Sequence, residues 1–455
     1  MSALALRFRR RVIAPVGICA LLVAGGDLTA NAGEPGRSGA PPAGVAPPVE
    51  ELVAKALAAA PSLAARRARV EAAQLAVRAA DVPADPMVEF EYRDGGFPKW
   101  TIGSDPMSMI GVSVRQPLLT KERKSARRAS AEADVGLRRA EAGLSASGLS
   151  TAVRTTYAEL YAVDRERAIL DDTQEIARLL VETAMARYTA GATDQASVLR
   201  AQVEQTRVSQ RAIDLDARRT ALVVSINRLL NEPPDTPLGE VRSLPEPLRL
   251  ADSSTRLPDL AAAHAPDVST RQADVSAAAR RVEVARAELR PNYTVGGGLY
   301  WQGGVDRVVS VTFGVEWPAR KSRKQLPLLA ASERELEAAR HDLDDAAAGM
   351  RAEAARLVAE IARDDRQIEQ FRSAVLPQSA ATFDAVRASY LTGSGDFSSV
   401  LDEFRRWTEA RVELVGLEAG RFALRSQLAA LVNAPAPGDS AGVVSEGLPS
   451  PKESR

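Results

Sequence analysis

Apolar residues recur with a period of seven over two long stretches of the chain. The first stretch carries one row of Val135, Ala142 and Leu149, and a companion row of Ala146, Val153 and Leu160. The second stretch repeats the pattern with Leu336, Leu343, Met350 and Leu357, followed by Ile361, Ile368 and Val375. Seven-residue spacing is typical of helices that pack as coiled coils. The row changes by four residues near Leu357, a stutter that locally unwinds a supercoil and lets helices run straighter.

These helices are expected to be very long. No proline occurs between Leu118 and Glu232, and a helix from about Glu122 to Ala186 would be about 100 Å long. The chain then turns at Gly191 and returns through Ser197–Leu230, so each stretch predicts an antiparallel helix pair. In the second stretch the outgoing helix meets Pro377, where a kink is expected.

Shorter segments alternate with a period of two and predict strands. The first two predicted strands are residues 87–93 and 109–115. The third is indicated by the apolar positions Tyr293, Val295, Leu299 and Trp301, and the fourth by Val309, Val311, Phe313, Val315 and Trp317. One face is apolar and the other is small or polar, which fits either a membrane barrel or a soluble half-buried hairpin. Four strands are too few to close a barrel, since the smallest use about eight. Membrane strands would have to be shared between copies, and three copies of four strands make twelve.

The sequence is an internal duplication with a separation of about 200 residues. Pro86 recurs as Pro291 after 205 residues, and Pro117 recurs as Pro318 after 201. The segment RYTAGATDQASVL recurs 202 residues later as SYLTGSGDFSSVL. Because the matches keep their order, we predict two repeats, 49–232 and 259–434, each with a helix, two strands and a long helix hairpin.

The remaining segments are expected to be a leader, a connector and two poorly ordered ends. Residues 1–32 hold a basic cluster, an apolar run from Val12 to Ala24 and a small-x-small site at Ala30–Ala32, which predict a cleaved signal peptide. The only cysteine, Cys19, follows Ile18 rather than the small residue of a lipoprotein site. The segment 33–48 and the tail 435–455 are rich in Pro, Gly and Ser, and the connector 233–258 contains six prolines.

Composition and motifs argue against several functional classes. Lys plus Arg and Asp plus Glu both number 59, so no net basic field favours nucleic acid as a partner. The two histidines, His264 and His341, lie far apart in predicted helices, and we expect no catalytic residue, no metal site and no cofactor. No Gly-rich phosphate loop with its lysine is found. The protein is therefore not expected to be an enzyme.

The arrangement resembles the TolC-type outer-membrane efflux family from about Glu51 to Asn433. The features that carry the resemblance are the duplication, the turns VSVRQPLLTKERKSARRASAEADV and VEWPARKSRKQLPLLAASERE, and the tip segments RYTAGATDQASVLRAQ and SYLTGSGDFSSVLDEF. The PADPMVEF and QPLL neighbourhoods look like the heavy-metal branch of the family.

The resemblance implies a mainly α fold with a small β part. Long antiparallel coiled-coil helices would form an α-barrel, and four strands per chain would contribute to a trimeric, twelve-stranded transmembrane β-barrel. Such a homotrimer sits in the outer-membrane lipid with a helical extension into the periplasm, and its tip docks a periplasmic adaptor that links it to an inner-membrane efflux pump. The implied function is a passive exit duct for small solutes such as metal ions or drugs. The alternative is a secreted coiled-coil spacer or adhesin without channel activity.

The family also implies a gate at the periplasmic tips, where charged and tyrosine side chains near the glycine constrict the resting tunnel. Tyr390 and Asp402 match such gate positions, whereas Ser197 and Ser399 occupy positions that are usually acidic. Asp194 and Asp396 are open to two interpretations: they cap the returning helices, or they form a ring selective for cations in a threefold assembly. The candidate tip residues are Tyr188, Gly191, Asp194, Ser197, Tyr390, Gly393, Asp396, Ser399 and Asp402.

Overall fold

The computed structural model describes residues 44–93, 108–245, 256–302 and 307–432. The predicted signal peptide with Cys19, most of the predicted segment 33–48 and the tail 435–455 lie outside these residues. Across the parts of the chain that are described, no helix has both the length and the apolar character needed to cross a membrane.

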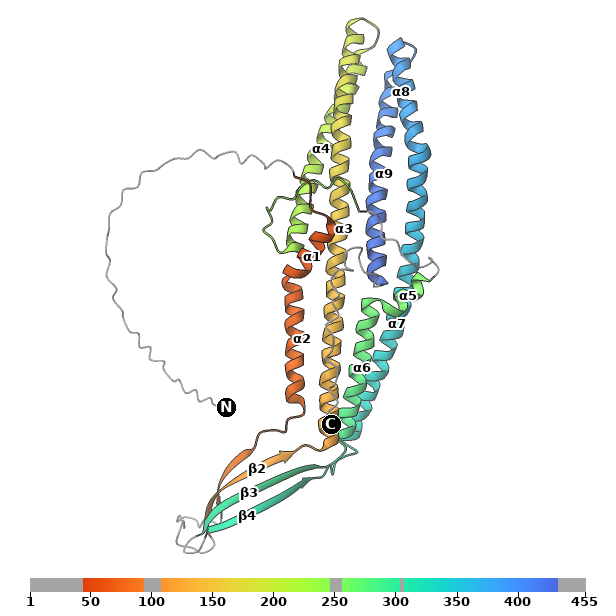
Figure 1. Cartoon of the computed structure of the whole chain (residues 1–455). Coiled ribbons are helices and arrows are strands. Elements are labelled where there is room, and N and C mark those ends of the chain that lie inside the picture. The colour runs from red at the N-terminus through yellow and green to blue at the C-terminus, as the bar shows by residue number, and fades with distance from the viewer. Residues whose placement is uncertain (1–43, 94–107, 246–255, 303–306, 433–455) are drawn as a thin grey trace, which may run out of the picture. The chain divides into compact units, whose positions relative to one another are not determined.

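Helices make up most of the described chain and occur in the same order in both repeats (Figure 1). The first repeat contains α1 Val49–Ala59, α2 Pro61–Ala80, α3 Lys121–Thr189 and α4 Gln195–Leu230. The second contains α5 Leu257–His264, α6 Pro266–Ala287, α7 Gln325–Gln370, α8 Leu376–Thr392 and α9 Phe397–Leu431. The predicted fold class, mainly α with a small sheet and a twofold internal repeat, is confirmed.

The ends of the helices follow from local sequence. Pro61 and Pro266 stand at the first position of α2 and α6, where a missing backbone N–H costs nothing. The Thr120 hydroxyl accepts from the Arg123 amide and begins α3, which then continues for 69 residues without a proline. At the other end of the hairpin, Asn231 closes α4 in the left-handed conformation with φ 58°.

Four antiparallel strands form one sheet in the order β1-β2-β3-β4 (Figure 1). The strands are β1 Met87–Arg93, β2 Met109–Leu118, β3 Asn292–Gln302 and β4 Arg307–Glu316. The central pairing, β2 with β3, joins the two repeats, with Val112 opposite Leu299. One face carries large apolar side chains in the open, with Phe90 84% and Val311 83% exposed. The sheet therefore has an apolar face that the described residues leave uncovered.

The helix interruption expected at Pro377 takes the form of a wide π-helical turn over Phe371–Val375, followed at once by α8. In this turn the Leu376 amide donates to the Phe371 carbonyl, five residues back. Pro377 has no N–H to offer the carbonyl four residues earlier, so the irregularity appears in the turn before the proline rather than at it.

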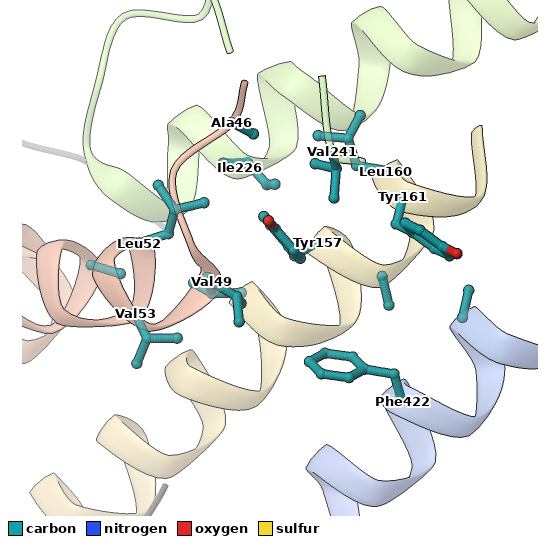
Figure 2. Packing of buried hydrophobic residues seen from close by; sticks show 14 of the residues in the cluster. Ala46, Val49, Leu52, Val53, Tyr157, Leu160, Tyr161, Ile226, Val241 and Phe422 are labelled. Carbon is teal, nitrogen blue, oxygen red and sulfur yellow. The ribbon is translucent and has the colours of Figure 1, made fainter. Parts of the chain in front are cut away.

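The main core lies where α1, α3, α4 and α9 meet the first part of the connector (Figure 2). Its fully buried members include Val49, Leu160, Ile226 and Val241, from four different segments. The buried Asp164 carboxylate fixes the connector, because it accepts from Arg219 Nε at 2.6 Å and from the Val241 amide at 2.8 Å. The start of the described chain joins the same region through a parallel bridge between Val45 and Glu240.

Candidate gate at the hairpin tips

The two helix hairpins, α3–α4 and α8–α9, share one apolar core near their turns. We call this set the tip cluster; its buried members are Ala177, Leu180, Ala184, Val198, Ala201, Phe383, Tyr390, Phe397, Val400, Leu401 and Phe404. Helix residues from all four helices contribute, so the two repeats are packed together at their tips.

The turns depend on the two glycines singled out in the sequence. Gly191 has φ 70° and Gly393 has φ 87°, conformations that favour glycine. In the second turn the amides of Gly393, Ser394 and Gly395 fold back onto the carbonyls of Ser389 and Tyr390. The turns are therefore tight and closed by their own backbone.

Both aspartates after the glycines cap the returning helix. The Asp194 carboxylate accepts from the amide of Ser197 at 2.9 Å and from its hydroxyl at 2.6 Å. These bonds lower the pKa of Asp194, the hydroxyl contributing most, so the cap is ionised at neutral pH. Asp396 accepts in the same way from the amide and hydroxyl of Ser398. The capping interpretation is confirmed, and both carboxylates remain exposed.

The two serines at usually acidic positions differ from each other. Ser197 is 4% exposed and is occupied by its bond to Asp194, whereas Ser399 is exposed. The repeats are therefore alike in sequence at this position but not in environment.

Tyr390 lies inside the tip cluster rather than on its surface. Its side chain is 3% exposed and its ring centroid is 5.2 Å from that of Phe397. Arg187, from the other hairpin, places its guanidinium 4.5 Å from the centre of the Tyr390 ring. The same guanidinium donates to the carbonyls of Tyr390 and Leu391 at the end of α8. Arg187 thus binds the ring of Tyr390 and the free end of α8 at once.

A second polar link joins the hairpins on the returning helices. Glu204 of α4 is 7% exposed and accepts from Arg405 Nε of α9 at 2.9 Å. Asp402 lies at the edge of this pair, 3.6 Å from the same guanidinium, with its side chain 60% exposed. Asp402 is therefore mostly open to solvent, whereas Glu204 is buried against Arg405. Tyr188, on the last turn of α3, is 43% exposed.

Arg187, Glu204 and Arg405 were not singled out from the sequence. The burial of Tyr390 had a signal, because Phe383, Tyr390, Phe397 and Phe404 step by seven across the second turn. No local sequence signal indicates the partners of Arg187 and Arg405, because these partners lie about 200 residues away in the other repeat. No group of His, Cys, Asp or Glu side chains suited to holding a metal ion occurs in the described ranges.

A sequence model described as "Outer membrane efflux protein" matches residues 52–232 and again residues 257–434. A comparison with curated proteins gives no match.

Solved structures with the same fold include two outer-membrane proteins and a third protein whose structures concern a transmembrane channel. The outer-membrane channel OprN matches with a TM-score of 0.73 and 17% identity, over 85% of this chain and 90% of its own. The outer membrane protein VceC from Vibrio cholerae matches with a TM-score of 0.72 and 17% identity, over 84% and 95%. CusC, whose structures concern folding and transmembrane channel formation, matches with a TM-score of 0.72 and 16% identity, over 84% and 91%.

Proposed function

This chain belongs to the outer membrane efflux protein family, and on that premise we propose that three copies form one continuous exit duct through the outer membrane and into the periplasm. The family consists of efflux channels and not of enzymes. The observation that carries the proposal is the family match over both repeats, together with a four-stranded sheet whose apolar face lies open.

The trimer is supported by the incompleteness of the single chain. Its sheet ends in two outer strands, β1 and β4, and an open edge inside a membrane leaves backbone groups without hydrogen-bond partners. Pairing β4 of one copy with β1 of the next removes both edges, and three copies supply twelve strands. Such head-to-tail contacts close into a ring when the rotation permits.

The tips are proposed to form the gate of this duct. Tyr188, Asp402 and the exposed carboxylates of Asp194 and Asp396 are the side chains available to a neighbouring copy or to an adaptor. The tip cluster and the Arg187 contact with Tyr390 hold the gate closed, since these contacts rearrange when the two hairpins move apart. A periplasmic adaptor at these tips and an inner-membrane pump behind it would supply cargo and energy.

Planar-bilayer recording tests the proposal. Purified protein in detergent should sediment as a trimer and should give discrete conductance steps once the tips are opened by mutation. Monomeric protein, or trimers that stay silent with opened tips, would exclude a duct. Screening a deletion strain with metals, dyes, detergents and antibiotics then identifies the cargo, which is proposed to include heavy-metal ions.

A further inference from the structure

A buried arginine at the start of α3 links the two repeats next to the sheet. Arg123, in the first turn of α3, is 7% exposed. Its Nε donates to the Ala287 carbonyl at 3.3 Å, and its Nη2 donates to the Glu288 and Arg290 carbonyls at 3.4 and 2.8 Å. Its Nη1 donates to Asn292, the first residue of β3. These carbonyls lie at the negative end of the α6 dipole, so the helix end neutralises a charge that no carboxylate contacts in the described residues.

The neighbouring residue adds an ion pair to the same place. Glu122 lies 3.0 Å from Arg290 across the gap between the start of α3 and the end of α6. We call this set of contacts, made by Glu122 and Arg123 on one side and 287–292 on the other, the inner junction. It stands directly beside the central pairing of β2 with β3, where the repeats meet.

The duplication places an equivalent set of residues at the two outer edges of the chain. Pro117 corresponds to Pro318, so Glu122 and Arg123 correspond to Arg323 and Lys324, just before α7. Pro86 corresponds to Pro291, so Ala287 corresponds to Val82 and Arg290 corresponds to Asp85, just after α2. The turn before α7 is closed by a bond from the Lys324 amide to the Arg320 carbonyl, and Lys324 stands at the N-cap of α7, whereas Arg123 lies in the first turn of α3.

The charged residues at these equivalent positions are open to solvent in the described part of the chain. Arg323, Lys324 and Asp85 are exposed, and none takes part in an ion pair among the described residues. Val82 is 56% exposed, whereas its counterpart Ala287 is 9% exposed. The signs of the charges are also inverted. The inner junction has the acid Glu122 at the start of α3 and the base Arg290 after α6. The outer edges have the base Arg323 before α7 and the acid Asp85 after α2.

We propose that Arg323 and Lys324 form an outer junction with the next copy of the chain, in which Arg323 pairs with Asp85 of the partner subunit. Lys324 takes the place of Arg123 and donates to backbone carbonyls after α2 of the partner subunit. The inference rests on the proposed trimer, and it specifies which residues join the copies above the sheet. The inversion makes the two junctions non-interchangeable, because Arg323 would repel Arg290 and Asp85 would repel Glu122. Copies are therefore steered into the head-to-tail register in which β4 meets β1.

Chemical crosslinking tests the contact directly. In a Cys19→Ser background, Asp85→Cys with Arg323→Cys should be joined by a short bis-maleimide into a ladder of dimers and trimers on a denaturing gel. The matched control, Glu122→Cys with Arg290→Cys, should react within one chain and remain at the monomer position. Trimers by ultracentrifugation without a ladder from the 85–323 pair would overturn the outer junction while leaving the duct intact. A wild-type protein that sediments as a monomer would overturn both.

Charge reversal tests the energetics of the same pair. Arg323→Glu alone should weaken each contact between copies by roughly fivefold, the size of one solvated ion pair made repulsive. Adding Asp85→Arg places an acid before α7 and a base after α2, as in the inner junction, so the two charges attract again and the trimer should be restored. Arg320→Glu carries the same charge change in the same turn and should have no effect. Equal losses from Arg320→Glu and Arg323→Glu, or no rescue by the double variant, would count against the assignment.

Discussion

Several arginine side chains link the two repeats of this subunit, and Arg187 is the clearest case. One guanidinium covers the Tyr390 ring and donates to two carbonyls at the end of α8, so charge-assisted bonds and a cation–π contact act together. Local sequence gives no hint of this role, because the residue that Arg187 meets lies 203 positions further on.

Replacing Arg187 should loosen the second turn. In Arg187→Ala, the loss of these contacts should lower the free energy of local opening at the turn by about 2 kcal/mol. Amide hydrogen exchange at Gly393, Ser394 and Gly395 should then become roughly 30-fold faster. Arg178→Ala, which removes an exposed arginine paired only within its own helix, serves as the control and should leave those amides unchanged. Unchanged exchange in Arg187→Ala would mean that the turn is held by its backbone alone.

Asp402 is predicted to restrict the resting channel. Its carboxylate is mostly exposed and only borders the pair of Arg405 with Glu204, so a neighbouring copy can reach it. Asp402→Ala should therefore raise single-channel conductance without affecting folding. Asp384→Ala, an exposed carboxylate paired with Arg387 in the same helix, provides the comparison. Equal conductance in Asp402→Ala and the wild type would remove Asp402 from the gate.

At the scale of elements, the Asp194 side chain caps α4, and the stability of that helix end depends on its carboxylate. Asp194→Ala should destabilise the first turn of α4, whereas Asp194→Asn keeps an acceptor and should destabilise it less. Because the folded-state pKa lies below the ordinary 3.8, the stabilisation by the charged cap is present at neutral pH and is lost as the pH falls through that lowered value.

Ion selectivity of Asp194→Asn tests whether the capping carboxylate also belongs to a charged ring. If Asp194 serves only as a cap, cation selectivity measured by reversal potential should be the same in Asp194→Asn and the wild type. A loss of selectivity in Asp194→Asn, with α4 still folded by circular dichroism, would instead establish a charged ring.

Periodicity located the elements well but not their contacts. The helix expected from Glu122 to Ala186 runs from Lys121 to Thr189, and the returning helix expected from Ser197 begins at Gln195. The first strand has the expected bounds, and the second extends three residues further, to Leu118. These features follow from local pattern and from the absence of proline. The Glu204–Arg405 link and the contact of Arg187 with the Tyr390 ring depend on packing between repeats, which no local pattern encodes.

At the scale of the whole molecule, the duplication gives one chain an inner contact between repeats and two outer edges built from corresponding residues. Inside the chain the contact consists of β2 with β3 and the inner junction of Arg123. Outside, the corresponding strands and charges are open. A molecule with such edges is expected to continue by adding copies until the ring closes.

The two faces of β4 provide the test that separates a membrane duct from a secreted spacer. Val311 and Thr312 are adjacent, both are exposed in the single chain, and they point to opposite faces of the sheet. A soluble hairpin would tolerate an arginine at either position about equally. In a membrane wall, Val311 faces lipid, where an arginine near the midplane costs roughly 2–4 kcal/mol, and Thr312 faces the wet lumen.

Val311→Arg should therefore deplete folded trimer from the outer-membrane fraction, and Thr312→Arg should be recovered at wild-type levels with a conductance changed by its new charge. Quantitative immunoblotting of membrane and soluble fractions measures the first, and bilayer recording measures the second. If both variants fractionate alike and neither changes conductance, the apolar face does not meet lipid. The open side of the sheet must then be covered by protein, and the duct would have to be replaced by the secreted coiled-coil spacer.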